Sequence, residues 1–320
     1  NKKYDGLPLI SDLVTVGGEG FASGDLFEFD VTGAITDVGR TKNSFTYSPA
    51  RGTLAENYNI TIDEGILEVS KRLVTLTSAN ASKKFDGTPL VERTVSVSGD
   101  GWAQGENASY SVSGTQTSVG SSLNDFTYTL TNGAKEENYL ITKVEGKLTV
   151  TEGDIVYTAE ECNAVYDGKG HSIFVNPTTP SGLVPRYSLS QNGSFTDVLP
   201  TFTNVCNDVV VWYVLEADQY EAVTNFAKVT IKKCPLESRM INAIADQRYT
   251  GLEITPKVGF ADIGNRKIIP SDYTLTYSNN RDVGQGAVKV SATEQGNYSG
   301  EVIVYFNITK ASYDMSKAKW

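Results

Sequence analysis

Apolar and polar residues alternate in short runs along most of the chain. Clear examples are residues 73–77, 94–98 and 147–150, which Gly, Asn and Ser bound. A half-buried β-strand gives this period of two, whereas an amphipathic helix repeats about every 3.6 residues. No window of a dozen residues carries a helical stripe. The pattern therefore predicts an all-β protein.

A turn motif, aromatic–Asp–Gly or a close variant, occurs four times. Its first residues are 81, 81 and 83 positions apart, which identifies an internal repeat. The motif residues are Tyr4, Asp5 and Gly6; Phe85, Asp86 and Gly87; Tyr166, Asp167 and Gly168; and Tyr249 and Gly251.

Two further landmarks follow each turn in a fixed order. The first is a Val–Gly pair, at Val38, Val119 and Val283, and its counterpart at Val205 is followed by Cys206. The second is an Asn–Tyr pair, at Asn57–Tyr58, Asn138–Tyr139, Gln219–Tyr220 and Asn297–Tyr298. We therefore predict four tandem β domains: repeat 1 (residues 1–71), repeat 2 (72–152), repeat 3 (153–234) and repeat 4 (235–310), with residues 311–320 starting a fifth.

Each repeat has room for six or seven short strands in about eighty residues, which suits a small antiparallel Ig-like sandwich or, alternatively, a β-grasp-like domain. The connectors lack Gly/Ser and Pro tracts, so we expect an elongated rod rather than flexibly tethered domains. Repeat 1 has only three residues before Tyr4, where repeat 2 has an opening strand before Phe85. We therefore expect repeat 1 to lack that strand and to present an open sheet edge, to which residues 310–320 could add.

Composition and charge remove several function classes. The chain carries 28 basic and 38 acidic residues, a formal charge of −10, which argues against nucleic acid and anionic membranes as partners. No apolar run approaches the ~20 residues of a membrane helix, so we expect no membrane insertion within this segment. A single histidine, His171, cannot build a multi-histidine metal site. It stands where repeats 1 and 2 have Leu9 and Leu90, which indicates packing rather than catalysis.

The shared motifs themselves are best explained by folding. Asp–Gly supplies a turn with positive φ, the aromatic residue packs at the core edge, and the Asn of Asn–Tyr is expected to bond local backbone. We predict no catalytic residue, metal site or cofactor. Calcium at the joints and a Lys–Asn isopeptide crosslink remain open alternatives, because carboxylates lie near the joints and crosslink partners would come from distant strands.

The three cysteines do not define a disulfide scaffold. Cys162 and Cys206 are both unusual residues of repeat 3, and this coincidence predicts a possible Cys162–Cys206 disulfide with Cys234 free. None of Trp102, Trp212 and Trp320 can be nominated as a binding anchor, so the ligand-binding residues are unknown.

The landmarks resemble the MBG and YDG-type repeats of bacterial surface proteins, named for mucin binding and for the Tyr-Asp-Gly turn. In repeat 1 the resemblance runs through Tyr4–Gly6, Val38–Gly39, Asn57–Ile60 and Gly65–Val69, and repeat 2 matches comparably. The segment from Tyr273 to Gly300 is similar to repeats of large Gram-positive wall proteins.

The resemblance implies a non-enzymatic, extracellular segment of a bacterial surface adhesin, either anchored at the cell surface or secreted. Such a segment would act as a stalk or present a binding surface for host glycoproteins, with mucin glycans as the implied partner. The alternatives are direct immunoglobulin binding, or accessory β domains of a secreted hydrolase. Neighbouring repeats of a longer chain are the remaining expected partners.

Overall fold

A computed structural model describes residues 1–316, and its secondary structure consists of strands β1–β25 and four 3-10 turns, η1–η4. The predicted all-β class is confirmed. The chain divides into an N-terminal unit, Asn1–Gly153, and a C-terminal unit, Asp154–Trp320. This division lies one residue beyond the expected boundary between repeats 2 and 3.

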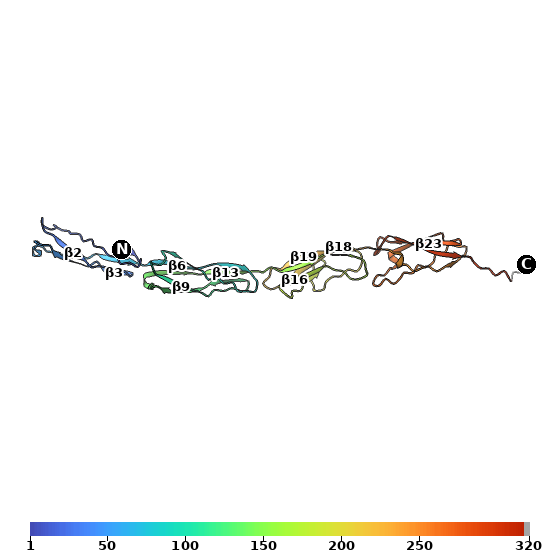
Figure 1. Ribbon diagram of the computed structural model, residues 1–320, viewed down its shortest axis with the longest axis horizontal. Coiled ribbons are helices and arrows are strands. Elements are labelled where there is room, and N and C mark those ends of the chain that lie inside the picture. The colour runs from blue at the N-terminus through green and yellow to red at the C-terminus, as the bar shows by residue number, and fades with distance from the viewer. Residues whose placement is uncertain (317–320) are drawn as a thin grey trace. The chain divides into compact units, whose positions relative to one another are not determined.

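Repeat 2 shows the complete arrangement of strands. Its opening strand is split: β6 pairs antiparallel with β8 and parallel with β12, whereas β7 pairs parallel with β13 in another sheet. Strand β13 also pairs with β10, and β9 pairs with β11. Its elements, several of them labelled in Figure 1, are β6 (Arg72–Ser78), β7 (Ala81–Lys84), β8 (Val95–Gly99), β9 (Asn107–Val112), β10 (Gly120–Asn124), β11 (Phe126–Thr131), η2 (Glu136–Asn138), β12 (Tyr139–Val144) and β13 (Gly146–Thr151).

Repeat 1 keeps only part of this arrangement. Strand β1 pairs parallel with β5, as β7 does with β13, while β3 pairs with β5 and β2 with β4. No described strand corresponds to β6, β8 or β12. The elements of repeat 1 are β1 (Lys2–Lys3), β2 (Phe27–Val31), β3 (Gly39–Lys42), β4 (Phe45–Pro49), η1 (Ala55–Asn57) and β5 (Ile66–Ser70).

Repeat 3 is built around a long hairpin. Strands β18 and β19 pair antiparallel and lie side by side in Figure 1, with β15 parallel to β19, β17 beside β18 and β14 paired with β16. The strands are β14 (Val156–Glu160), β15 (Cys162–Val165), β16 (Phe174–Thr179), β17 (Arg186–Ser188), β18 (Cys206–Leu215) and β19 (Val223–Lys232).

Repeat 4 has the sheet order β21–β25–β23–β22 and a short parallel pair, β20–β24. Strand β20 begins at Cys234, the last residue assigned to repeat 3, so the pairing of Cys234 places it in repeat 4. The elements are β20 (Cys234–Pro235), η3 (Ser238–Met240), β21 (Gln247–Arg248), η4 (Pro270–Asp272), β22 (Tyr273–Ser278), β23 (Gly284–Ala292), β24 (Tyr298–Ser299) and β25 (Glu301–Thr309).

The hydrophobic core of each unit runs through the contact between its two repeats. In the N-terminal unit one buried cluster joins Tyr4 and Val69 of repeat 1 to Leu76, Phe126 and Tyr139 of repeat 2. A second cluster joins repeats 3 and 4 in the C-terminal unit. Because fully burying one such side chain stabilises by about 1.5–3 kcal/mol, the contact contributes to the stability of both partners.

Candidate functional site: the joints between repeats

The aromatic residue of the first turn meets the Asn–Tyr pair of the next repeat. The Tyr4 ring packs edge-on against the Tyr139 ring, with centroids 5.6 Å apart, and Trp102 contacts Tyr139 at 5.0 Å. The Tyr139 hydroxyl donates to Glu106 Oε2 at 2.5 Å, and the Tyr4 hydroxyl donates to the other oxygen of the same carboxylate. One carboxylate of repeat 2 thus holds a tyrosine from each repeat.

The protonation of these phenols suits a permanent contact. Burial, followed by the hydrogen bond to Glu106, raises the pKa of Tyr139 to about 12. The same two causes raise the pKa of Tyr4 still further above its usual range. Both hydroxyls therefore remain donors at neutral pH, and bonds to a charged acceptor are the stronger kind.

The Val–Gly landmark meets the asparagine of the same pair. The Val38 N–H donates to Asn138 Oδ1 at 2.9 Å, and Asn138 Nδ2 donates to Asp37 Oδ1 at 2.8 Å. Lys135 pairs with the other oxygen of Asp37 at 2.6 Å and lowers the pKa of that carboxyl. Asn138 is fully buried. The expectation that this asparagine bonds local backbone is wrong, because its acceptor atom serves a backbone N–H one hundred residues away.

The connector between repeats 1 and 2 is fixed by its own arginine. Arg72 donates to the carbonyl oxygens of Gly101 at 2.7 Å, Asp100 at 2.6 Å and Tyr4 at 3.3 Å. Lys3 forms an ion pair with Asp100 at 2.7 Å. The guanidinium therefore satisfies carbonyl groups on both sides of the joint.

The C-terminal unit forms the same joint with equivalent residues. The Tyr166 ring packs edge-on against Tyr298 at 5.5 Å, and the Val205 N–H donates to Asn297 Oδ1 at 2.9 Å. Asn297 Nδ2 contacts Asn204 Oδ1 at 3.3 Å, where the first joint has Asp37. Burial, and then the neighbouring Tyr166, raises the pKa of Tyr298. Two joints with different sequences thus use the same three landmarks.

The polar centre differs between the two joints. The Tyr298 hydroxyl donates to the Lys267 carbonyl oxygen at 3.4 Å rather than to a carboxylate. Arg266 lies with Nη1 3.3 Å from the Cys234 sulfur, and Cys234 occupies the position that Arg72 has in the first joint. The guanidinium at the second joint therefore comes from Arg266 in the interior of repeat 4, and it contacts the thiol of Cys234.

The aromatic–Asp–Gly segments form tight turns that present these rings. Asp5 Oδ1 accepts from the Leu7 N–H at 2.9 Å, and Asp86 and Asp167 make the same bond to residues Thr88 and Lys169. Gly6, Gly87, Gly168 and Gly251 have φ of 84°, 80°, 77° and 77°, a region that glycine enters without steric cost. Sequence reasoning identified these turns but not their place at a joint.

His171 extends the turn of repeat 3. Its Nε2 lies 2.8 Å from Asp167 Oδ1, and its backbone bridges Phe202. The Lys169 N–H and then His171 lower the pKa of Asp167. The imidazole is thereby bonded to a turn carboxylate, which is a structural use of the side chain.

The predicted Cys162–Cys206 disulfide is not present, and all three cysteines are free thiols. Cys162 lies on β15 opposite Val229, and Cys206 lies on β18 opposite Ile231, so β19 separates the two. Strands two places apart in a sheet are about 9.5 Å apart, beyond the ~7 Å Cα separation that a disulfide spans. Cys234 is buried at the second joint.

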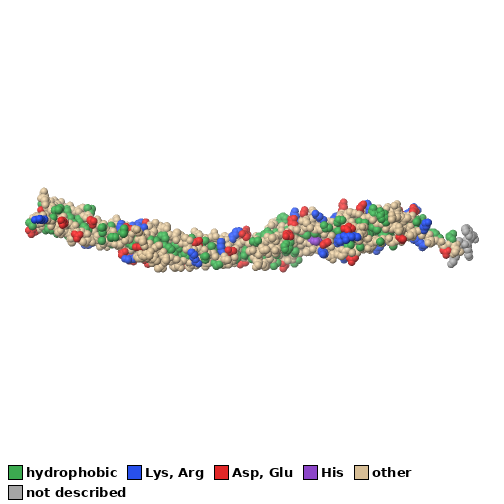
Figure 2. All heavy atoms as spheres, viewed as in Figure 1, with side chains coloured by type: hydrophobic (Ala, Val, Ile, Leu, Met, Phe, Trp, Pro, Cys, Tyr) green, Lys and Arg blue, Asp and Glu red, His purple; other side chains and the backbone are tan. Residues whose placement is uncertain are grey.

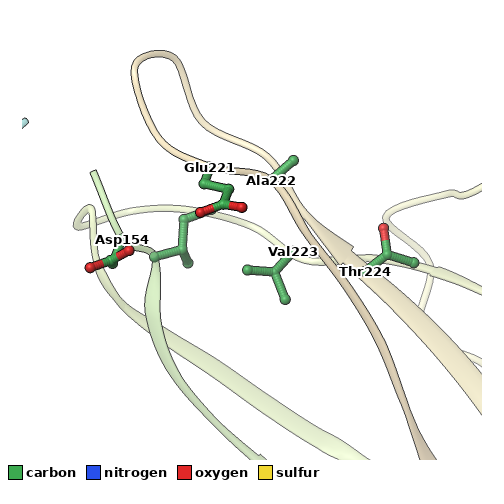
Figure 3. Close-up of a pocket in the computed structure, with 6 residues that line it drawn as sticks. Asp154, Glu221, Ala222, Val223 and Thr224 are labelled. Carbon is green, nitrogen blue, oxygen red and sulfur yellow. The ribbon is translucent and has the colours of Figure 1, made fainter. Parts of the chain in front are cut away.

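Shallow hollows occur among the described residues of the C-terminal unit. One, of about 300 Å³, is lined by Asp154, Ile155 and residues 221–224, and Figure 3 shows the Asp154 and Glu221 carboxylates at one end of it. Another, of about 330 Å³, is lined by residues 279–285. No group of three or more His, Cys, Asp or Glu side chains able to hold a metal ion occurs among residues 1–316.

An aromatic pair faces outward from the long hairpin of repeat 3. Trp212 and Phe226 lie directly opposite each other on β18 and β19, with ring centroids 5.0 Å apart, while the neighbouring Val211 and Tyr213 are buried. The sequence did not reveal this pair, because the run from Val209 to Val214 is apolar on both faces and conceals the alternation. Acidic and basic side chains are interspersed over the surface seen in Figure 2.

No known family profile matches the chain, and no curated protein matches it. Solved structures that resemble it include the insect immune protein hemolin, at 10% identity and a TM-score of 0.30, covering 97% of each chain. Titin domains I67–I69 match at 8% identity and 0.29, covering 74% of this chain and 97% of theirs. Drosophila N-cadherin EC1-4 matches at 10% and 0.23, covering 96% and 98%. Likeness at this level says nothing about what this chain binds. Among the described residues, no helix is long and apolar enough to cross a membrane.

Proposed function

We propose that this chain is a non-enzymatic stalk segment of a bacterial surface adhesin, in which one fixed joint holds repeat 1 to repeat 2 and another holds repeat 3 to repeat 4. The observation that supports this most is the position of the shared landmarks. Tyr4 with Tyr139, and Tyr166 with Tyr298, meet between repeats, and the bonds from Val38 to Asn138 and from Val205 to Asn297 accompany them.

A spacer needs such joints for a physical reason. A short connector limits how far two repeats can separate, but only contacts between the repeats fix their relative orientation. At each joint an aromatic contact and two side-chain hydrogen bonds define the orientation of the two repeats, and at the first joint the bonds from Arg72 to carbonyl groups add to them. The energy of a tandem array is then the sum of repeat and joint contributions.

The test is whether two repeats of one unit tumble as one body. Residual dipolar couplings of the full chain should give a single alignment tensor for repeats 1 and 2, and likewise for repeats 3 and 4. The double variant Tyr4→Ala, Asn138→Ala should separate the first pair of tensors while leaving the second pair unchanged. Different tensors for repeats 1 and 2 in the unaltered chain would contradict the proposal.

A second candidate function, binding of a host glycoprotein, is favoured by the outward Trp212–Phe226 pair. Phe226 is 43% exposed, and a flat aromatic pair on a sheet face suits stacking against a sugar ring. Mucin glycans and immunoglobulin are the partners to test, with the unaltered chain and Trp212→Ala on the same arrays. Binding that Trp212→Ala abolishes supports this face, and binding that the substitution leaves unchanged contradicts it.

A further inference from the structure

Strand β22 is an edge of the sheet of repeat 4, whose strand order is β21–β25–β23–β22. Among the described residues it pairs with β23 alone, antiparallel, in a register that sets Tyr273 opposite Ala292 and Ser278 opposite Ala287. Its residues alternate between half-buried and exposed along the whole strand. One long side of a regular strand is therefore left without a neighbouring strand.

Two hydrogen bonds fix which backbone groups of β22 face β23. The Thr293 N–H donates to the carbonyl oxygen of Asp272, just before β22 begins, at 2.9 Å. The Ala292 N–H donates to the Gly300 carbonyl oxygen, on the side of β25, at 2.9 Å. In an antiparallel pair only every second residue exchanges both backbone bonds with the neighbouring strand. The residues of β22 that bond to β23 are therefore Thr274, Thr276 and Ser278.

The backbone N–H and C=O groups of Tyr273, Leu275 and Tyr277 point away from β23. No described residue forms a backbone hydrogen bond with these three. Exposed strand edges are commonly protected by charged side chains, Pro or a bulge. Strand β2 carries Glu28 and Asp30, whereas β22 contains no charged residue, Pro or Gly and has an unbroken register. The edge of β22 is therefore open to the addition of a strand.

Side-chain contacts on the inner face hold β22 extended. The Tyr273 ring lies 4.8 Å from the Phe260 ring, measured between centroids, and the Tyr277 hydroxyl donates to the Pro256 carbonyl oxygen at 2.9 Å. Leu275, between these two tyrosines, packs against the hydrophobic core of the C-terminal unit. Because the strand is already ordered, it loses little conformational freedom when another strand pairs with it.

The sequence of β22 reads the same in both directions around Leu275, as Tyr-Thr-Leu-Thr-Tyr over residues 273–277. Two copies paired antiparallel about a two-fold axis through Leu275 place Tyr273 opposite Tyr277 and Thr274 opposite Thr276. In this register the residues with outward-pointing backbone groups meet one another and can exchange hydrogen bonds. Aromatic–aromatic and Thr–Thr pairs are favourable across strands, and no like charges meet. The strand is thus complementary to itself.

We propose that the edge of β22 is a self-association surface, on which β22 of a second copy of this chain pairs antiparallel about a two-fold axis through Leu275. Each of three residue pairs exchanges two backbone hydrogen bonds, so the two four-stranded sheets join into one. Because the same surface is used on both copies, the contact is isologous and association stops at a dimer. This contact is separate from the joints between repeats and goes beyond the stalk function.

Mass and amide exchange of the full chain test this proposal. Sedimentation equilibrium should show a monomer–dimer equilibrium with a Kd of about 0.1–1 mM, because the contact of one short strand is small. Hydrogen exchange followed by NMR should slow at Tyr273, Leu275 and Tyr277 as the concentration rises through this range. The amides of Thr274 and Thr276 should keep their exchange rates, because they already bond to β23.

Two double variants test the register. Thr274→Glu with Thr276→Glu sets like charges opposite each other at two places across the axis and should weaken association about tenfold. Thr274→Lys with Thr276→Glu sets opposite charges at the same two places and should associate about tenfold more tightly than the first variant. Both positions are exposed, and position 276 faces Lys289 of β23 in each variant, so the two variants are matched in their own fold.

Three results would overturn the proposal. They are a chain that stays monomeric at about 1 mM, equal association of the two double variants, and concentration-dependent protection that spares Tyr273, Leu275 and Tyr277. A peptide with the sequence of residues 272–278 provides one more outcome. If the chain stays monomeric while this peptide protects the three amides, the edge accepts an extended segment other than a second copy, which also contradicts the proposal.

Discussion

Replacing Asn138 by Ala should uncouple repeats 1 and 2. Its side chain accepts the Val38 N–H and donates to Asp37, and it is fully buried. The substitution removes two hydrogen bonds worth about 0.5–1.5 kcal/mol each and leaves a partly buried N–H without an acceptor. We expect the free energy of unfolding of the N-terminal unit to fall by about 2 kcal/mol.

Two measurements check this expectation. Urea denaturation followed by fluorescence of Trp102, which lies in the joint, should shift to lower urea by about 1 M for a fall of this size. The Val38 amide should exchange about thirtyfold faster. Asn57→Ala is the matched control, because Asn57 has the same place in repeat 1 but is exposed. Equal effects of the two substitutions would refute the assignment of Asn138 to the joint.

Three further expectations concern single groups. The pKa of Tyr139 is raised from 10.0 to about 12, so the stability that its hydroxyl contributes is complete below pH 10 and is lost as the pH rises to about 12. Between these pH values the free energy of unfolding should therefore fall less steeply in Tyr139→Phe than in the unaltered chain. Gly146→Ala should lower the free energy of unfolding of repeat 2 by about 1–3 kcal/mol, because the new Cβ meets the Ser78 carbonyl oxygen. In the same denaturation experiments Gly65→Ala should change the free energy of unfolding by no more than about 0.5 kcal/mol. Peptide mapping without reductant should recover three free thiols, and a recovered Cys162–Cys206 crosslink would contradict the strand order around β19.

Strand sequences and turns were predictable because their causes are local. Alternation over five residues identifies a strand such as β6, and an Asp–Gly pair requires only its own backbone to turn. These features need no knowledge of the neighbouring domain.

The joints could not be derived in the same way, because their partners are distant in sequence. Tyr4 and Glu106 are 102 residues apart, and Val38 and Asn138 are 100 apart. The landmarks were visible as repeated residues, but repetition alone does not separate a residue that folds its own domain from one that contacts the next. The Cys162–Cys206 disulfide could not be judged from the sequence for a related reason. Two rare residues in one repeat give no information on β19, the strand that lies between them.

The position of the landmarks explains why repeats 1 and 2, although close in sequence, differ in their environments. Tyr139 receives Tyr4 and is 2% exposed, whereas Tyr58, with the same hydroxyl bonds, is half-buried. Since hydrophobic stabilisation follows the apolar area removed from water, each joint stabilises the repeat that supplies the Asn–Tyr pair and the one that supplies the ring.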